Sequence, residues 1–118
     1  MTEKGKFLKS FNEAFANGDI KTVLDAMTDD VEWVIVGDKT ILGKAAVQSE
    51  LQQMMPKAPL KISLAQIITH GKEAAVSGKI KMKDESLYAF CDTYEFSGFK
   101  NPKIKKMVSF VIKVDQTA

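Results

Sequence analysis

The residues best placed to do chemistry in this chain form a stripe at two-residue spacing: Tyr88, Phe90, Asp92, Tyr94 and Phe96. Residues two apart share one face of a β-strand, so four rings and one carboxylic acid are predicted to lie side by side. A purely structural core avoids a carboxyl group, because burying its charge is costly. The stripe therefore predicts a ligand pocket with a single acid–base group, Asp92.

Burial in such a pocket would raise the pKa of Asp92 and keep it partly protonated, able to donate a hydrogen bond. Two other interpretations stay open. In the first, Asp92 is a structural residue that is hydrogen-bonded to a nearby hydroxyl or amide. In the second, a different strand register turns Asp92 outward. Tyr88 and Tyr94 could offer hydroxyls to a ligand, or fill a core and bond a backbone group.

Other candidates for acid–base or nucleophilic chemistry are weak. His70, the single histidine, is expected at an exposed hairpin turn because a glycine follows it. Glu32 has the opposite parity to the apolar residues of its strand, and Asp38 falls in a turn. Cys91 points away from the acid of the stripe and has no basic neighbour in sequence. One histidine and one cysteine make no cluster with metal-ligand spacing, so we expect no metal and no cofactor.

The elements that would position these residues follow from periodicity. Three N-terminal helices are predicted: one capped by Thr2 and ended at 17–18, a short one capped by Asp19 and running to residue 27, and one over 44–55 ended by Pro56. Strands are predicted over 31–36, 60–69, 74–83, 87–97 and 104–114, with hairpin connections at 70–72, 84–86 and 98–102. Helices followed by a curled antiparallel meander make an α+β fold, a cone whose open end is a natural pocket.

Length and composition narrow the function further. At 118 residues the chain is predicted to be one domain, 1–118, large enough for a core and a modest cavity. The net charge is +2 and all 17 basic residues are lysines, which argues against nucleic-acid and membrane partners. A single cysteine allows no intramolecular disulfide, and no signal peptide or membrane span is expected. These features predict a cytoplasmic protein.

Several segments resemble the nuclear transport factor 2-like (NTF2-like) superfamily, closest to its SnoaL-like and ketosteroid-isomerase-like branch. They are residues 11–19 (FNEAFANGD), 29–33 (DDVEW) and 92–96 (DTYEF), with Gly43 opening the third helix. The resemblance implies a cone-shaped, curved antiparallel sheet covered by three N-terminal helices, the NTF2-like or cystatin-like roll. It also implies a homodimer paired through the outer sheet face. The small or uncharged candidates for that contact are Ala75, Ser77, Ala89, Cys91, Thr93, Ser109 and Val111.

Ketosteroid isomerases use an aspartate base on the first strand, with a tyrosine and a protonated aspartic acid as oxyanion donors. By resemblance, the donor acid falls on Asp92, the donor tyrosine on Phe11, and the base at or near Ile35. Phe11 has no hydroxyl, and the run over 34–36 has no titratable group. Isomerisation of a ketosteroid by the family mechanism is therefore not expected.

We interpret the sequence as a SnoaL-like protein that binds a small, largely apolar molecule, with Asp92 as acidic group and candidate catalytic residue. The predicted pocket residues are Phe11, Phe15, Trp33, Ile35, Tyr88, Phe90, Tyr94 and Phe110. One alternative is a cyclase, isomerase or dehydratase that uses Asp92 as acid or base and needs a second titratable group across the pocket. The other is a protein-interaction module, which needs an exposed apolar patch or an anionic groove. This fold class hosts all three kinds of function.

Overall fold

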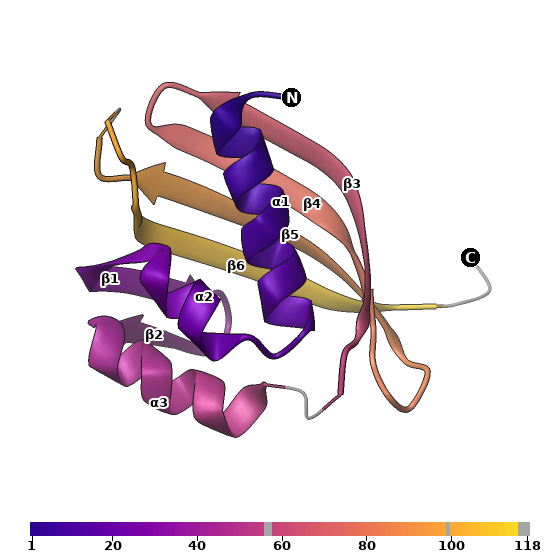
Figure 1. Cartoon of the computed structure of the whole chain (residues 1–118). Helices are drawn as coiled ribbons and strands as arrows, with labels where there is room; N and C mark the ends of the chain where they lie inside the picture. The colour runs from indigo at the N-terminus through magenta and orange to yellow at the C-terminus, as the bar shows by residue number, and fades with distance from the viewer. Residues whose placement is uncertain (56–57, 99, 116–118) are drawn as a thin grey trace.

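A curved β-sheet with helices against one face forms the body of the computed structural model, which describes residues 1–55, 58–98 and 100–115 (Figure 1). In this described part the helices are α1 (Glu3–Ala16), α2 (Ile20–Asp25) and α3 (Lys44–Met54). The strands are β1 (Met27–Ile35), β2 (Lys39–Leu42), β3 (Lys61–His70), β4 (Glu73–Lys81), β5 (Leu87–Phe96) and β6 (Ile104–Val114). The predicted α+β class is confirmed, with a sheet that is curved but does not close.

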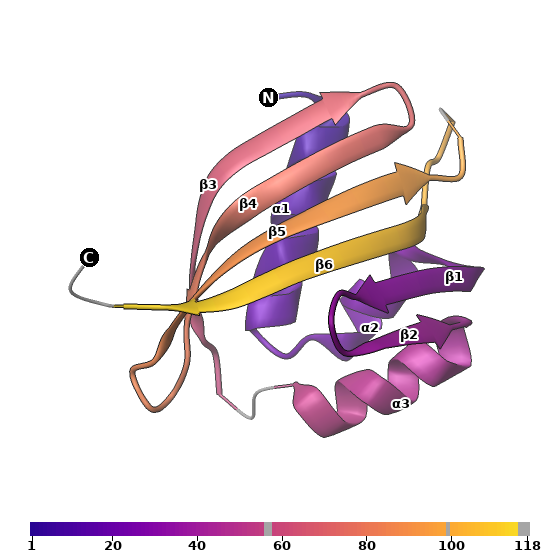
Figure 2. The ribbon, with the colours of Figure 1, turned by 180° about the vertical axis from the view of Figure 1, so that it is seen from behind.

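The strand order within the described residues is β2-β1-β6-β5-β4-β3. Neighbouring strands are antiparallel except β1 and β6, which pair in parallel. Strands β3 to β6 form the predicted meander, and α1 lies across one face of it, as Figures 1 and 2 show from opposite sides. We call the face under α1 the inner face and the opposite one the outer face.

Helix α1 begins where the Thr2 side chain caps it. The Thr2 hydroxyl oxygen accepts a hydrogen bond from the Gly5 amide at 2.9 Å, which satisfies one of the free N–H groups of the first turn. Apolar residues recur at three- and four-residue spacing, so one side of the helix packs on the sheet. Leu8 and Phe11 are buried there, and the Phe11 ring meets the Tyr94 ring of β5 edge-on with centroids 6.0 Å apart.

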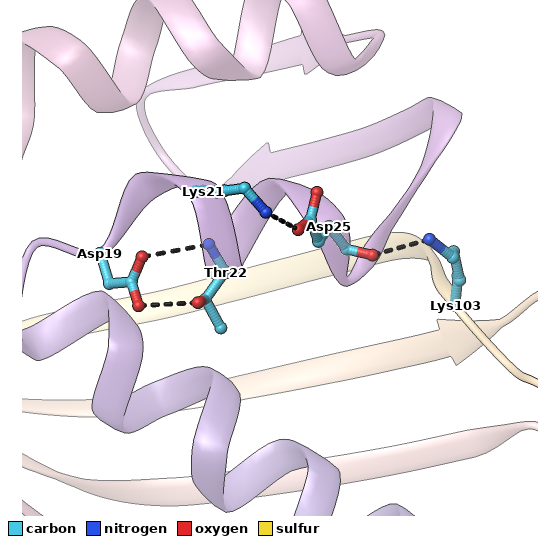
Figure 3. Close-up of polar contacts among 5 residues, drawn as sticks. All are labelled: Asp19, Lys21, Thr22, Asp25 and Lys103. Atoms are coloured by element: carbon cyan, nitrogen blue, oxygen red, sulfur yellow. Dashed lines mark hydrogen bonds and ion pairs between the residues drawn. The ribbon is translucent and has the colours of Figure 1, made fainter.

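Polar contacts hold both ends of the short helix α2 (Figure 3). The Asp19 carboxylate accepts hydrogen bonds from the Thr22 hydroxyl at 2.7 Å and the Thr22 amide at 3.2 Å, which lower the pKa of Asp19. At the other end, the Lys103 ammonium donates to the carbonyl oxygen of Asp25 at 2.8 Å, and Lys21 pairs with the Asp25 carboxylate at 3.0 Å. The Lys103 contact ties the helix to the residue just before β6.

Strand β1 begins earlier than predicted, and α2 ends earlier. The aspartates at 29–30 suggested that the strand started after them, but Met27 already pairs with Ile104 of β6. The register of this pairing shifts between Met27 and Glu32, so the aspartates lie in an irregular, exposed stretch. Strand β2 was not predicted, because four residues with one buried side chain are too few to show a period.

The remaining elements agree with the predicted ones to within two residues at each end. Pro56, predicted to end the third helix, and Phe99, in the predicted 98–102 hairpin connection, lie outside the described residues. No helix in the described ranges is long and apolar enough to cross a membrane.

A close approach between β3 and β4 accompanies the curvature of the sheet. Gly78 pairs with Leu64, next to a register shift between Leu64 and Gln66. A Cβ at Gly78 would overlap the carbonyl oxygen of Ser63, so the two strands can come this close only with glycine at this position. A bulge of this kind bends its strand. The bulge thereby contributes to the curvature of the sheet, whose inner face is concave on the side of α1.

The two faces of β6 are the reverse of the predicted ones. Ser109 pairs with Asp92 and Phe110 with Cys91, so Ser109 and Val111 lie on the inner face and Phe110 on the outer face. The segment around them is apolar at both parities, so local alternation could not decide which side faces the core. Phe110 is therefore not a pocket residue, and Ser109 and Val111 are not outer-face residues. The predicted outer-face residues on β4 and β5 do have that parity: Ala75, Ser77, Ala89, Cys91 and Thr93.

Candidate functional site

A cavity of about 250 Å³ lies between α1 and the inner face of the sheet. Its lining is largely apolar and comes from helices α1 and α3, strands β1 and β3 to β6, and two residues that flank strands. The lining residues are Phe11, Asn12, Phe15, Trp33, Ile35, Met54, Leu60, Ile62, Ile80, Met82, Tyr88, Phe90, Asp92, Met107, Ser109 and Val111.

The side chains that the sequence assigned to a pocket fall into two groups. Those that line the cavity are Phe11, Phe15, Trp33, Ile35, Tyr88, Phe90 and the acid Asp92. Tyr94 does not line it, because its ring is buried between α1 and the sheet and its hydroxyl is bonded there. Phe110 is half exposed on the outer face. Every second residue of β5 thus lines the cavity from Tyr88 to Asp92, whereas Tyr94 and Phe96 lie in the core.

Asp92 is the one charged side chain among the described residues that line the cavity. Burial raises its pKa from 3.8 to about 6, against hydrogen bonds from Ser109 and Tyr94 that lower it. In the described part of the chain, no charged neighbour contributes to this shift. The acid is therefore ionised above pH 6 without a cationic partner among the residues that the structure describes.

A series of hydrogen bonds, which we call the first arm, connects Asp92 to side chains of β6 and β1. The Trp33 indole N–H donates to the Ser109 hydroxyl oxygen at 2.9 Å, and Ser109 hydrogen-bonds to Asp92 across the β5–β6 pair. Trp33 and Ser109 are both buried. The ring of Phe15 from α1 packs edge-on against the Trp33 ring with centroids 6.4 Å apart, which holds the indole in place.

A second arm reaches Asp92 from α1. The Asn12 amide nitrogen donates to the Leu8 carbonyl oxygen at 2.9 Å and to the Tyr94 hydroxyl at 3.2 Å. The Tyr94 hydroxyl in turn donates to Oδ2 of Asp92 at 3.4 Å. Burial, followed by the nearby Asp92 charge, raises the pKa of Tyr94 well above its usual value of 10.0, so this tyrosine stays protonated.

Sequence reasoning missed Asn12 and Ser109. A signal existed for each, because each is a polar residue inside an apolar pattern. Asn12 lies four residues after the buried Leu8 on the apolar side of α1, and Ser109 interrupts the apolar run of β6. A buried polar side chain needs a hydrogen-bond partner, and such positions therefore indicate an internal network.

The other sequence candidates lie away from the cavity. Glu32 faces Lys106, with 3.9 Å between its carboxylate oxygen and the lysine nitrogen, and Asp38 is exposed in the turn after β1. His70 is exposed at the end of β3. Cys91 has outer-face parity. Within the described residues, no three or more histidine, cysteine, aspartate or glutamate side chains are grouped to hold a metal ion.

Comparisons with known proteins agree with this architecture. The profile of the SnoaL-like domain matches residues 8–107. No curated protein matches the chain in sequence. Among solved structures, an NTF2-like protein of unknown function from Cytophaga hutchinsonii is 25% identical with a TM-score of 0.72, over 91% of this chain and 97% of that one.

Two more distant structures share the fold. An NTF2-like protein of unknown function from Burkholderia xenovorans is 19% identical with a TM-score of 0.79, over 94% of this chain and 84% of that one. An LEH-like epoxide hydrolase from M. tuberculosis is 18% identical with a TM-score of 0.74, over 91% of this chain and 80% of that one. At these identities the likeness extends to the fold alone.

Proposed function

The chain belongs to the SnoaL-like domain family of NTF2-like proteins, and from its site we propose that it binds a small, largely apolar molecule in the cavity under α1. The Asp92 carboxyl group binds the polar part of this molecule and so fixes its orientation. The observation that carries the proposal is the wall itself, apolar over most of its area with one carboxyl group on it. An apolar hollow with few convergent polar groups is the usual form of a small-molecule site.

The volume of the cavity limits the size of the ligand. An engineered apolar cavity of about 150 Å³ accommodates benzene. At about 250 Å³, the cavity has room for a molecule of roughly two fused rings or a short branched chain. Large polycyclic ligands do not fit unless the wall moves.

The rim of the cavity is also apolar. Met54, Met82 and Val111 line the cavity and are 44%, 39% and 55% exposed, so they mark where it opens to water. Methionine side chains are flexible and polarisable, and they adapt to the shape of different apolar groups. A rim of this kind supports entry of an apolar ligand.

Binding is better supported than catalysis. An acid–base enzyme needs a second titratable group close to the ligand. Among the described lining residues, the Tyr88 phenol is the titratable group that accompanies Asp92. Glu32 and His70 are the other candidates for the second titratable group that an enzyme would need. Neither lines the cavity, because Glu32 faces Lys106 and His70 is exposed.

The proposal is tested by a thermal-shift screen of one- and two-ring molecules that bear amine, hydroxyl, carbonyl or carboxylate groups. A ligand at a hundred times its dissociation constant stabilises the fold by about 2.7 kcal/mol. Ile80→Trp should abolish the shift, because it fills cavity space, whereas Lys79→Trp adds the same ring at the opposite parity of β4 and should not. A screen without a stabilising ligand, or equal binding by Ile80→Trp, would refute the proposal.

A further inference from the structure

The hydrogen bonds around Asp92 have a direction that can be worked out atom by atom. At the far end of the first arm is the Trp33 indole N–H, which can donate but not accept. The Ser109 hydroxyl oxygen, 2.9 Å away, must therefore be the acceptor. Its own proton is left for its other hydrogen bond, which is the one to Asp92. The first arm delivers a proton donor to the carboxylate.

The second arm has the same direction. The Leu8 carbonyl of α1 can only accept, so the atom of Asn12 that lies 2.9 Å from it is the amide nitrogen. The same nitrogen donates its other hydrogen to the Tyr94 hydroxyl at 3.2 Å. The Tyr94 proton is then free for Asp92, whose Oδ2 lies 3.4 Å away. This arm too ends in a donor pointing at the carboxylate.

The cavity is therefore rich in acceptors and poor in donors. The amide hydrogens of Asn12 are used, so what this residue can still offer is its carbonyl oxygen, an acceptor. The indole N–H of Trp33 is used by Ser109. An ionised carboxylate has about four lone-pair positions and no proton to give, and the two arms fill part of them. On the described wall, the Tyr88 hydroxyl is the side-chain donor not assigned to a protein partner.

The residues that the structure describes also supply no countercharge to the carboxylate. Asp92 pairs with Val76 on β4 and Ser109 on β6, and the two arms connect it to Asn12 of α1 and Trp33 of β1. Tyr94, on its own strand, is the titratable side chain that contacts it, and Tyr94 is neutral. A buried charge without a partner is costly, and a cation at hydrogen-bond distance offsets that cost.

We infer that the ligand of this cavity is an apolar amine, whose protonated nitrogen donates hydrogen bonds to the Asp92 carboxylate while its hydrocarbon part fills the apolar space. The inference rests on the proposed function and narrows it to one class of ligand. Ketones, aldehydes and carboxylates present acceptors or a negative charge to a site that already has both, so the site disfavours them.

The test uses three probes with the same ring system and different polar groups: 2-(aminomethyl)naphthalene, 2-methylnaphthalene and 2-naphthoate. Their dissociation constants are measured by calorimetry at pH 7.5 and pH 5 with the whole chain. At pH 7.5 the amine should bind at least tenfold more tightly than the methyl compound, and the naphthoate most weakly. An alkyl ammonium group stays protonated across this range.

Acidification should remove the advantage of the amine. Because Asp92 has a pKa of about 6, about a tenth of it is ionised at pH 5, so amine affinity should fall about tenfold. The affinity of the methyl compound should not fall. Asp92→Asn should reduce the amine to the affinity of the methyl compound at pH 7.5. Glu95→Gln, which removes a carboxylate from the opposite face of the same strand, should leave all three affinities unchanged.

Each outcome has a distinct meaning. If the methyl compound or the naphthoate binds as tightly as the amine, the inference about the ligand class is overturned while the cavity remains a binding site. If none of the three probes binds, the proposed function fails with it. The comparison of pH 5 with pH 7.5 uses wild type alone, so it decides the question even if Asp92→Asn does not fold.

Discussion

Replacing Asp92 by asparagine should change how the stability of the protein depends on pH. Burial raises the pKa of Asp92 from 3.8, its usual value, to about 6. The folded chain therefore holds this proton more tightly than the unfolded chain, and the charged acid destabilises the fold. The penalty is absent below pH 3.8, grows as pH rises, and is fully present above pH 6.

The size of the effect follows from the two pKa values. They differ by about 2.2, and at about 1.36 kcal/mol for each pKa unit the full penalty is about 3 kcal/mol. At pH 7.5 all of it is present. At pH 4.5 roughly 1 kcal/mol remains, because the unfolded carboxyl is still mostly ionised there. Between these two pH values wild type should gain about 2 kcal/mol relative to Asp92→Asn.

Urea unfolding followed by fluorescence of Trp33, the one tryptophan of the chain, measures this difference. With a slope of about 2 kcal/mol per molar urea, the midpoint of wild type should rise by roughly 1 M relative to the variant on going from pH 7.5 to pH 4.5. Glu95→Gln, a change on the outer face, should follow wild type. Parallel pH dependence of wild type and Asp92→Asn would refute the argument that burial controls this acid.

Three other changes test the structure at separate points. Tyr94→Phe removes a donor to Asp92 and should raise the pKa of Asp92 further, measured by carbon NMR of the carboxyl; an unchanged pKa would show that the Tyr94 proton points elsewhere. Gly78→Ala should cost about 1–3 kcal/mol in urea unfolding, because its Cβ would overlap the Ser63 carbonyl oxygen, and wild-type stability would contradict that close approach. We also propose that two copies pair through the outer sheet face, so light scattering should give a dimeric mass for wild type and a monomeric one for Phe110→Lys; a monomeric wild type would overturn this.

Much of the architecture could be predicted because its signals are local. The Thr2 cap and the three- and four-residue apolar spacing define α1 within a few turns of chain. The two-residue spacing of β5 placed Tyr88, Phe90 and Asp92 on one face, since side-chain direction along a strand follows from the backbone alone.

Other features depend on pairing with distant segments. The faces of β6 could not be predicted, because apolar residues occur at both parities and the pairing of Ser109 with Asp92 decides which side is inner. The four residues of β2 became a strand through their pairing with β1. Tyr94 belongs to the stripe by spacing, but the approach of α1 buries it behind the cavity wall.

The sequence by itself determined the α+β class and the presence of one acid among aromatic residues, because periodicity expresses these directly. The family was indicated by the resemblance of residues 11–19, 29–33 and 92–96 to NTF2-like proteins. The tertiary structure decided what surrounds that acid. Asn12 and Trp33 lie in segments far from Asp92 in the chain, and folding brings them to the two ends of a hydrogen-bonded network whose direction makes Asp92 an acceptor. Hydrogen-bond direction depends on which groups meet in space, and spacing along the chain does not carry that information.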